Sequence, residues 1–301
     1  MSDSLLFCNS IEDGIRKCFG TDISIEGRTP VGGGDINDAY ALQLSDGKTV
    51  FMKSNTAVNK DFFEAEAGGL NAIALTGVIK TPELFFYGVD EDEGVSFLVM
   101  EYISGGQKKA TFWTEFGRNL AAMHMADTKG LVNSGRYGFT HDNFIGATEQ
   151  INIPKDSWIE FFRSFRLEPQ FIRAERYFDC DDIVKIQRLL DKLPGLLAEP
   201  ERPSLLHGDL WAGNYIVGND GDAWLIDPAV YVGHAEADLA MTELFGGFPP
   251  EFYKAYSEVN PISADYKDRK ALYNLYHLLN HLNLFGTTYL GAVMSTVRYY
   301  V

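Results

Sequence analysis

The feature that most constrains this chain is a set of three polar residues around two short apolar runs. Asp209 is followed by Asn214 five residues later and by Asp227 eighteen residues later. The apolar runs, residues 215–217 and 223–226, are typical of two small strands joined by a glycine-containing hairpin turn. Such a hairpin is expected to bring the three polar side chains together at one end.

This spacing matches the catalytic loops of phosphoryl-transfer enzymes. In those loops an Asp receives the proton of the attacking hydroxyl, an Asn five residues on binds Mg²⁺, and a later Asp bridges the metal ions. Here His207-Gly-Asp209 stands where protein kinases have His-Arg-Asp. The alternative is an ordinary loop whose polar side chains hydrogen-bond to the turn backbone. The catalytic interpretation therefore requires a nucleotide site in the N-terminal third.

A glycine run in that third is a candidate phosphate cradle. Gly32, Gly33 and Gly34 lie between two predicted strands, where backbone N–H groups can approach phosphates without obstruction by a Cβ atom. The run is weak evidence alone, because a tight hairpin uses the same residues. It is neither a Walker A motif, since no Gly-Lys-Ser/Thr follows, nor a dinucleotide fingerprint, since a strand comes next.

Lys53 is the stronger indication of a nucleotide site. It ends the strand Val50-Phe-Met-Lys53 and corresponds to the strand lysine that pairs with α- and β-phosphates in kinases. An acidic partner is expected on the following helix, where Glu64 and Glu66 are both available. The alternative is a solvated lysine near exposed acids. The order of glycine loop, lysine, acidic helix and catalytic loop favours the nucleotide site.

The apolar strand that follows is expected to reach the adenine. Its end, formed by Met100, Glu101, Tyr102 and Ile103, is predicted to line the adenine pocket and to form the hinge between two lobes. An ordinary core strand followed by a linker is compatible with the same residues.

The hydrophobic periodicity divides the chain into a strand-rich third and a helix-rich remainder. We predict an α+β fold with two lobes, residues 1–102 and 103–301. The first lobe is expected to hold a five-stranded antiparallel sheet with one helix, near 62–75, between its third and fourth strands; residues 4–19 also show helical spacing, and 137–153 is expected to be a loop. The strands are expected at 23–31, 37–44, 48–53, 84–89 and 95–103. Helices are expected from 112 to 124, 156 to 173, 181 to 197, 235 to 245, 250 to 259 and 267 to 284.

Composition excludes several classes of function. A net charge of −16 in 301 residues argues against nucleic-acid binding, which needs clustered Lys and Arg. The acidity is compatible with a cationic substrate, or with solubility alone. No apolar run is long enough to cross a bilayer, and no secretory signal is visible. Three widely spaced cysteines indicate reduced thiols and a cytoplasmic location.

Several longer motifs resemble the fructosamine kinase (ketosamine-3-kinase) family. They extend over nearly the whole chain, and the tryptophan-containing catalytic loop is the most specific of them. The motifs are Gly33-Gly-Asp-Ile-Asn37, Arg166-Leu-Glu-Pro-Gln170, His207-Gly-Asp-Leu-Trp-Ala-Gly-Asn214, the segment from Asp238 to Phe248, and Leu275-Tyr-His-Leu-Leu-Asn-His-Leu282. The resemblance implies a protein-kinase-like fold related to aminoglycoside and choline kinases. It also implies phosphorylation, by ATP with Mg²⁺, of a sugar hydroxyl on ketosamines, the rearranged products of amine glycation.

The resemblance also implies a role for each matching residue. Asp209 is expected to be the base, Asn214 and Asp227 the Mg²⁺ ligands, and Lys53 with Glu66 the pair that orients the phosphates.

Trp211, beside the base, is expected to form a wall for the sugar, with a core aromatic as the alternative. Some family members carry a cysteine in the glycine loop that supports redox control. Asp35 stands there in this chain, so that control is not expected.

The sequence around the last aspartate narrows the substrate. Pro-Ala follows Asp227 where protein kinases have Phe-Gly, and the short span to the next helix leaves no room for an activation loop. A small-molecule substrate is therefore expected. A monomer is favoured, although the sequence does not give the oligomeric state. A kinase of aminoglycosides or choline-like alcohols and a catalytically silent ATP-binding module stay open as alternatives. His124, His277 and His281 are expected to be core or interface histidines without metal.

Overall fold

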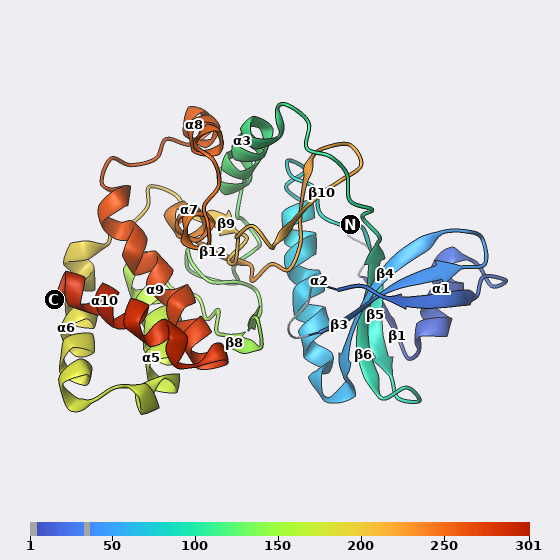
Figure 1. Cartoon of the computed structure of the whole chain (residues 1–301), viewed down its shortest axis with the longest axis horizontal. Helices are drawn as coiled ribbons and strands as arrows, with labels where there is room; N and C mark the ends of the chain where they lie inside the picture. The colour runs from blue at the N-terminus through green and yellow to red at the C-terminus, as the bar shows by residue number, and fades with distance from the viewer. Residues whose placement is uncertain (1–4, 33–36) are drawn as a thin grey trace.

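The structure is a computed structural model that describes residues 5–32 and 37–301 (Figure 1). Its N-lobe is a six-stranded sheet in the order β1-β5-β6-β4-β3-β2, with the helices α1 and α2 packed against it. β1 runs parallel to β5, and the other neighbouring strands are antiparallel. The elements are β1 (Leu6–Cys8), α1 (Ile11–Phe19), β2 (Ile25–Pro30), β3 (Asp38–Leu44), β4 (Thr49–Thr56), α2 (Lys60–Ala74), β5 (Leu84–Asp90) and β6 (Val95–Glu101).

The prediction of a five-stranded, wholly antiparallel sheet with one helix was wrong at the N-terminal end of the chain. Residues expected to be the start of a helix form the parallel edge strand β1, and the helix begins only after Ser10, whose hydroxyl caps it by accepting from the Asp13 N–H. Gly88 allows β1 to lie this close. A Cβ on Gly88 would stand 1.8 Å from the Cys8 carbonyl oxygen.

The two faces of the sheet carry separate apolar clusters. Side chains alternate along β6, so Phe97 and Val99 pack toward α1 while Leu98 and Met100 pack toward α2. The α2 face is the one that turns toward the rest of the molecule, and α2 lies between the sheet and the helical half in Figure 1.

The C-lobe is mainly helical, as predicted, and its core is one large apolar cluster. Within the described ranges, no helix is long and apolar enough to cross a membrane. Small two-stranded sheets pair β7 with β8, β9 with β12, and β10 with β11. The elements are α3 (Phe112–His124), β7 (Asn143–Ile145), β8 (Thr148–Gln150), α4 (Trp158–Phe162), α5 (Glu168–Arg173), α6 (Cys180–Leu196), β9 (Ser204–Leu206), β10 (Tyr215–Val217), β11 (Ala223–Leu225), β12 (Tyr231–Gly233), α7 (Ala235–Leu244), α8 (Pro250–Val259), α9 (Tyr266–Phe285) and α10 (Leu290–Tyr300).

Three details of the C-lobe differ from the predicted pattern. The segment 137–153, expected to be a loop, contains the hairpin β7–β8, and α10 was not predicted. The single helix expected at 156–173 is divided by a π-helical turn at Arg163–Leu167. That turn carries Arg166, whose guanidinium is fully buried and donates to the Asn152 side chain at 2.7 Å. The motif containing Arg166 therefore serves the core of the lobe.

The chain crosses between the lobes after β6. From Glu101 it runs without regular structure to α3. A boundary after residue 102 stays a prediction.

Candidate active site

The loop between β9 and β10 is held in place by the carboxylate of Asp238 on α7. Its Oδ2 accepts from the His207 backbone N–H at 2.7 Å, and its Oδ1 accepts from the Gly208 N–H at 2.8 Å. Oδ2 also lies 3.1 Å from Nε2 of His124, whose Nδ1 is 2.7 Å from the Tyr256 hydroxyl. Burial raises the pKa of Asp238, but the His124 hydrogen bond and the nearby histidines outweigh it and lower the pKa overall. Asp238 is therefore a buried carboxylate with a full set of donors.

His207 joins this loop to the strand end that carries Asp227. Its ring accepts the Asp209 N–H at Nδ1, 3.3 Å away, so Nε2 holds the proton and donates to the Ile226 carbonyl at 2.9 Å. The ring is fully buried, and burial lowers its pKa, which keeps it neutral. The histidine of the His207-Gly-Asp209 motif thus has a structural role, because it links the catalytic loop to Ile226.

Asp209 and Asn214 face each other across the loop. The Asn214 amide donates to the Asp209 carbonyl oxygen at 2.7 Å and to its carboxylate Oδ2 at 3.1 Å. Burial, chiefly, raises the pKa of Asp209 to about 7; the Asn214 hydrogen bond lowers it, and the negative charges of Asp227 and Asp238 raise it further. A carboxyl with a pKa near the working pH is suited to accept a proton.

Lys53 connects the two lobes. Cross-strand pairing with Leu98 turns its side chain to the α2 face of the sheet, where Nζ donates to Glu66 Oε1 at 2.6 Å. Nζ also contacts the carboxylate of Asp227. Burial lowers the pKa of Lys53, but the Asp227 and Glu66 carboxylates outweigh it and raise the pKa above its ordinary value, so the amine is charged.

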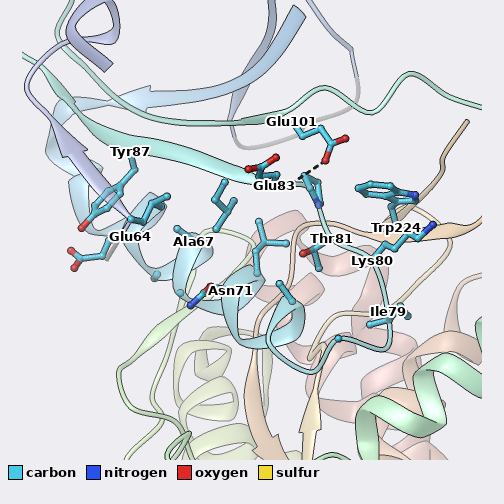
Figure 2. A pocket seen from close by; sticks show the side chains of 18 of the residues that line it. Glu64, Ala67, Asn71, Ile79, Lys80, Thr81, Glu83, Tyr87, Glu101 and Trp224 are labelled. Atoms are coloured by element: carbon cyan, nitrogen blue, oxygen red, sulfur yellow. Dashed lines mark hydrogen bonds between the residues drawn. The ribbon is translucent and has the colours of Figure 1, made fainter. Parts of the chain in front are cut away.

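Of the two acids available on α2, the structure places Glu66 against Lys53. Glu64 lies on another face of the helix, beside Tyr87 (Figure 2).

Asp227 has an unusual backbone conformation. Its φ of 53° is the one positive φ among the non-glycine residues within the described ranges. Asp tolerates this left-handed region better than most residues, and such strain is concentrated at functional sites. The turn lets the Ile226 N–H donate to the Asn214 carbonyl at 3.1 Å, which places the two predicted metal ligands on adjoining backbone.

These residues fit a magnesium site of the kind kinases use. Asn214 and Asp227 offer hard oxygen ligands, and the Asp227 side chain is 44% exposed. Over residues 5–32 and 37–301 there is no group of three or more His, Cys, Asp or Glu placed to hold a metal. Mg²⁺ commonly takes one or two protein ligands and completes its shell with phosphates and water, so two residues suffice.

The predicted cradle and hinge are only partly described. Gly32 follows β2, whereas Gly33 and Gly34 lie outside the described residues, as does Asp35. Met100 is buried against α2, and the Glu101 N–H donates to the Glu83 carbonyl at 2.8 Å.

Tyr102 and Ile103 follow directly and are partly exposed. Contact of the segment from Met100 to Ile103 with adenine stays a prediction.

Trp211 lies on the surface beside the catalytic loop. Its side chain is 38% exposed, and its ring meets the Phe245 ring edge-on with centroids 6.1 Å apart. Gly213 makes room for it, because a Cβ there would stand 2.3 Å from the indole. The exposure disfavours the alternative of a core aromatic and is compatible with a substrate wall.

A separate cavity of about 1140 Å³ opens behind α2 (Figure 2). Glu64, Gly68 and Asn71 line it, a helical face that excludes Glu66. Lys80 and Trp224 form another part of its wall, and Glu83 and Glu101 are joined there by a hydrogen bond. None of the catalytic-loop residues lines this cavity, whereas Glu101 of the predicted hinge does.

The role of Asp238 was not predicted from the sequence. Asp238 is the first residue of a segment that resembles the family, and no local pattern links it to a loop thirty residues earlier. His124 and His277 are buried, as expected for core histidines, and His281 is half-buried.

Replacing Asp238 tests the anchor. In Asp238→Asn one carboxylate oxygen becomes an amide that cannot accept both backbone N–H groups, so a buried donor loses its partner. We expect a loss of about 2–4 kcal/mol in the free energy of unfolding. Urea denaturation measures it, with Glu251→Gln on the exposed first turn of α8 as the control. A loss below about 0.5 kcal/mol would show that the loop does not depend on this carboxylate.

Replacing Asp209 tests its burial. The folded pKa of about 7 lies above the ordinary value of 3.8, so the folded state binds this proton more tightly. The contribution to stability is full below about pH 4 and is lost as the pH rises through about 7. Asp209→Asn has no such loss, so its gain over the wild type should be larger at pH 8 than at pH 5.

The expected difference is about 1–2 kcal/mol, discounted because the side chain is 20% exposed. Thermal unfolding without nucleotide or Mg²⁺ at both pH values provides the measurement. A gain that is the same at pH 5 and pH 8 would contradict the raised pKa.

Comparison with known proteins identifies the family of the chain. The sequence model of the fructosamine kinase family matches residues 7–301. A probable ketoamine kinase from Synechocystis is 42% identical, covering 93% of this chain and 92% of that protein. A chloroplastic protein-ribulosamine 3-kinase from Arabidopsis thaliana is 40% identical, covering 90% of this chain and 81% of its own.

Solved structures agree as well. A protein assigned as a fructosamine-3-kinase from Thermobifida fusca superposes with a TM-score of 0.82 at 32% identity, covering 97% of this chain and 98% of its own. The aminoglycoside phosphotransferase APH(4)-Ia, in complex with AMP-PNP and hygromycin B, has a TM-score of 0.63 at 16% identity, with 96% and 98% covered, and shares the fold alone. The predicted kinase-like α+β fold is confirmed, and the chain belongs to the fructosamine kinase family.

Proposed function

We propose that this protein transfers the γ-phosphoryl group of ATP to a sugar hydroxyl of a ketosamine, with Asp209 as the base. The observation that carries the proposal is the shared position of the base and the phosphate-side residues. The Asn214 amide donates to the Asp209 carboxylate, and the Asn214 carbonyl accepts from the N–H of Ile226, which precedes Asp227. Asp227 in turn contacts Lys53. The relatives named ketoamine kinase and protein-ribulosamine 3-kinase support the substrate class.

The phosphate side of the site is formed by both lobes. The charged amine of Lys53, fixed by Glu66, would pair with the α- and β-phosphates. Asn214 and Asp227 would hold Mg²⁺, which neutralises charge that develops on the phosphates during transfer. Because Asp227 contacts Lys53, the carboxylate would have to leave the amine in order to hold the cation, and Glu66 would keep the amine in place. Gly32 to Gly34 would cover the phosphates, and Met100 to Ile103 would contact the adenine.

Asp209 orients the acceptor and takes its proton. Asn214 holds Oδ2, which leaves Oδ1 to accept a hydrogen bond from the sugar hydroxyl. As the hydroxyl oxygen forms its bond to the γ-phosphorus, the bond to the ADP oxygen breaks and the proton passes to Asp209. Most of the rate enhancement then comes from alignment and charge stabilisation.

The substrate side is suited to a cationic amino sugar. Trp211 presents an exposed indole next to the base, and an indole face attracts a protonated amine. The net charge of −16 raises the local concentration of cations. We place the enzyme in the cytoplasm, where free thiols such as those of its three cysteines stay reduced. A monomer stays our expectation.

A substrate panel at fixed ATP and Mg²⁺ tests the proposal. Wild-type protein should release ADP with fructosyl- and ribulosyl-amines. In Asp209→Asn, turnover should fall by at least about 100-fold because the base is lost. Binding of ATP, measured by calorimetry, should be retained, since Asp209 is not assigned to the nucleotide.

The alternatives give different results in the same panel. Turnover of an aminoglycoside or choline with none of the ketosamines would indicate a related small-molecule kinase. ATP binding without turnover of any acceptor would indicate a silent module. Normal turnover by Asp209→Asn would exclude this residue as the base.

A further inference from the structure

His277 on α9 faces the proposed base, and the proposed reaction assigns it no role. Its side chain is 4% exposed, and Nδ1 is buried with no hydrogen-bond partner among the described residues. Oδ1 of Asp209 lies 3.7 Å from that nitrogen. This separation exceeds the usual hydrogen-bond distance by less than about 1 Å.

His277 differs from the other buried or half-buried histidines nearby. Both ring nitrogens of His124 have partners, the Tyr256 hydroxyl and the Asp238 carboxylate. His281, one turn further along α9, bonds through Nδ1 to the His277 carbonyl oxygen at 2.9 Å. A buried polar atom without a partner is destabilising. Among these three histidines, only His277 has a buried ring nitrogen without a partner in the described part of the chain, and the carboxylate of Asp209 faces that nitrogen.

Asp209 has one oxygen that matches this need. Its Oδ2 is held by Asn214 at 3.1 Å, and its Oδ1 is the oxygen that faces His277. A carboxylate held at one oxygen can still turn about its side-chain bond. A second donor at Oδ1 fixes the plane of the carboxylate and leaves a lone pair free for the substrate hydroxyl.

The charge state of His277 suits a donor of this kind. Burial first, together with His281 and Arg166, lowers its pKa to about 3, although Asp238 opposes the shift. The ring is therefore neutral and carries one proton. With that proton on Nδ1, it can donate to a carboxylate without adding a charge to the site.

We propose that His277 is a positioning residue for Asp209, and that its Nδ1–H donates to Oδ1 when the substrate draws the catalytic loop and α9 together. The inference rests on the proposed role of Asp209 as the base. The carboxylate is then held at both oxygens, by Asn214 from the loop and by His277 from α9. These two hydrogen bonds align the lone pair of the base with the acceptor hydroxyl. His277 therefore affects the rate of transfer more than nucleotide binding.

Two polar substitutions separate this role from core packing. In His277→Asn the amide nitrogen replaces Nδ1 at nearly the same place, whereas in His277→Gln it reaches the position of Nε2. Tyr273→Phe is the matched control, because it removes the polar group of another fully buried side chain on α9, about one turn away. Thermal unfolding of each variant checks that it is folded.

The readouts are kcat and the two KM values in ADP release with a fructosyl-amine. His277→Gln should lower kcat by about 10- to 100-fold, the cost of a misaligned base, with KM for ATP within about twofold of wild type. His277→Asn should keep kcat within about threefold of wild type. Tyr273→Phe should match wild type.

Equal kcat values for His277→Asn and His277→Gln would overturn the proposal, and so would a loss expressed only in KM for ATP. The wild type and Asp209→Asn, assayed beside them, keep the two proposals apart. If wild type turns over and Asp209→Asn does not, normal kcat in both His277 variants contradicts the positioning role alone. If wild type fails on every ketosamine, the proposed function itself is contradicted.

Discussion

The buried carboxylate of Asp238 is the contact on which the catalytic loop depends. It accepts two consecutive backbone N–H groups, from His207 and Gly208, and a third donor from His124. The loop also requires glycine at position 208. Gly208 has a φ of 83°, and a Cβ on it would stand 2.0 Å from the Ala229 carbonyl oxygen. An ion buried in this way is stable only when its donors are complete, so the loop geometry and the charge of Asp238 fix each other.

Lys53 makes a charged contact that joins the two lobes. Its amine is paired with Glu66 in the N-lobe and contacts Asp227 in the C-lobe, so a single charge lies between two carboxylates. The position of α2 therefore matters for the nucleotide site, because α2 carries Glu66. The cavity lined by Glu64, Gly68 and Asn71 borders a different part of that helix from the one that carries Glu66 (Figure 2).

The sequence predicted the parts of the site that are local in the chain. The spacing of Asp209, Asn214 and Asp227 was readable because one hairpin positions all three, and the family resemblance is confirmed by the comparisons. The spacing alone could not choose between Glu64 and Glu66, because the rotation of α2 about its axis depends on packing; the family resemblance implied Glu66. The role of Asp238 and the approach of His277 to Asp209 depend on tertiary contacts and leave no local pattern. The strand β1 was missed because three residues give too short a period to recognise.

The acceptor of the phosphoryl group is the central question for this enzyme, and phosphorus NMR of the reaction products identifies it directly. With wild-type protein, ATP, Mg²⁺ and a fructosyl-amine, we predict a new phosphate monoester on a sugar hydroxyl, formed in step with ADP. Asp209→Asn should give no such signal under the same conditions. Release of inorganic phosphate alone, or a phosphoryl group on the amine nitrogen, would contradict a site in which Asp209 presents a sugar hydroxyl to ATP.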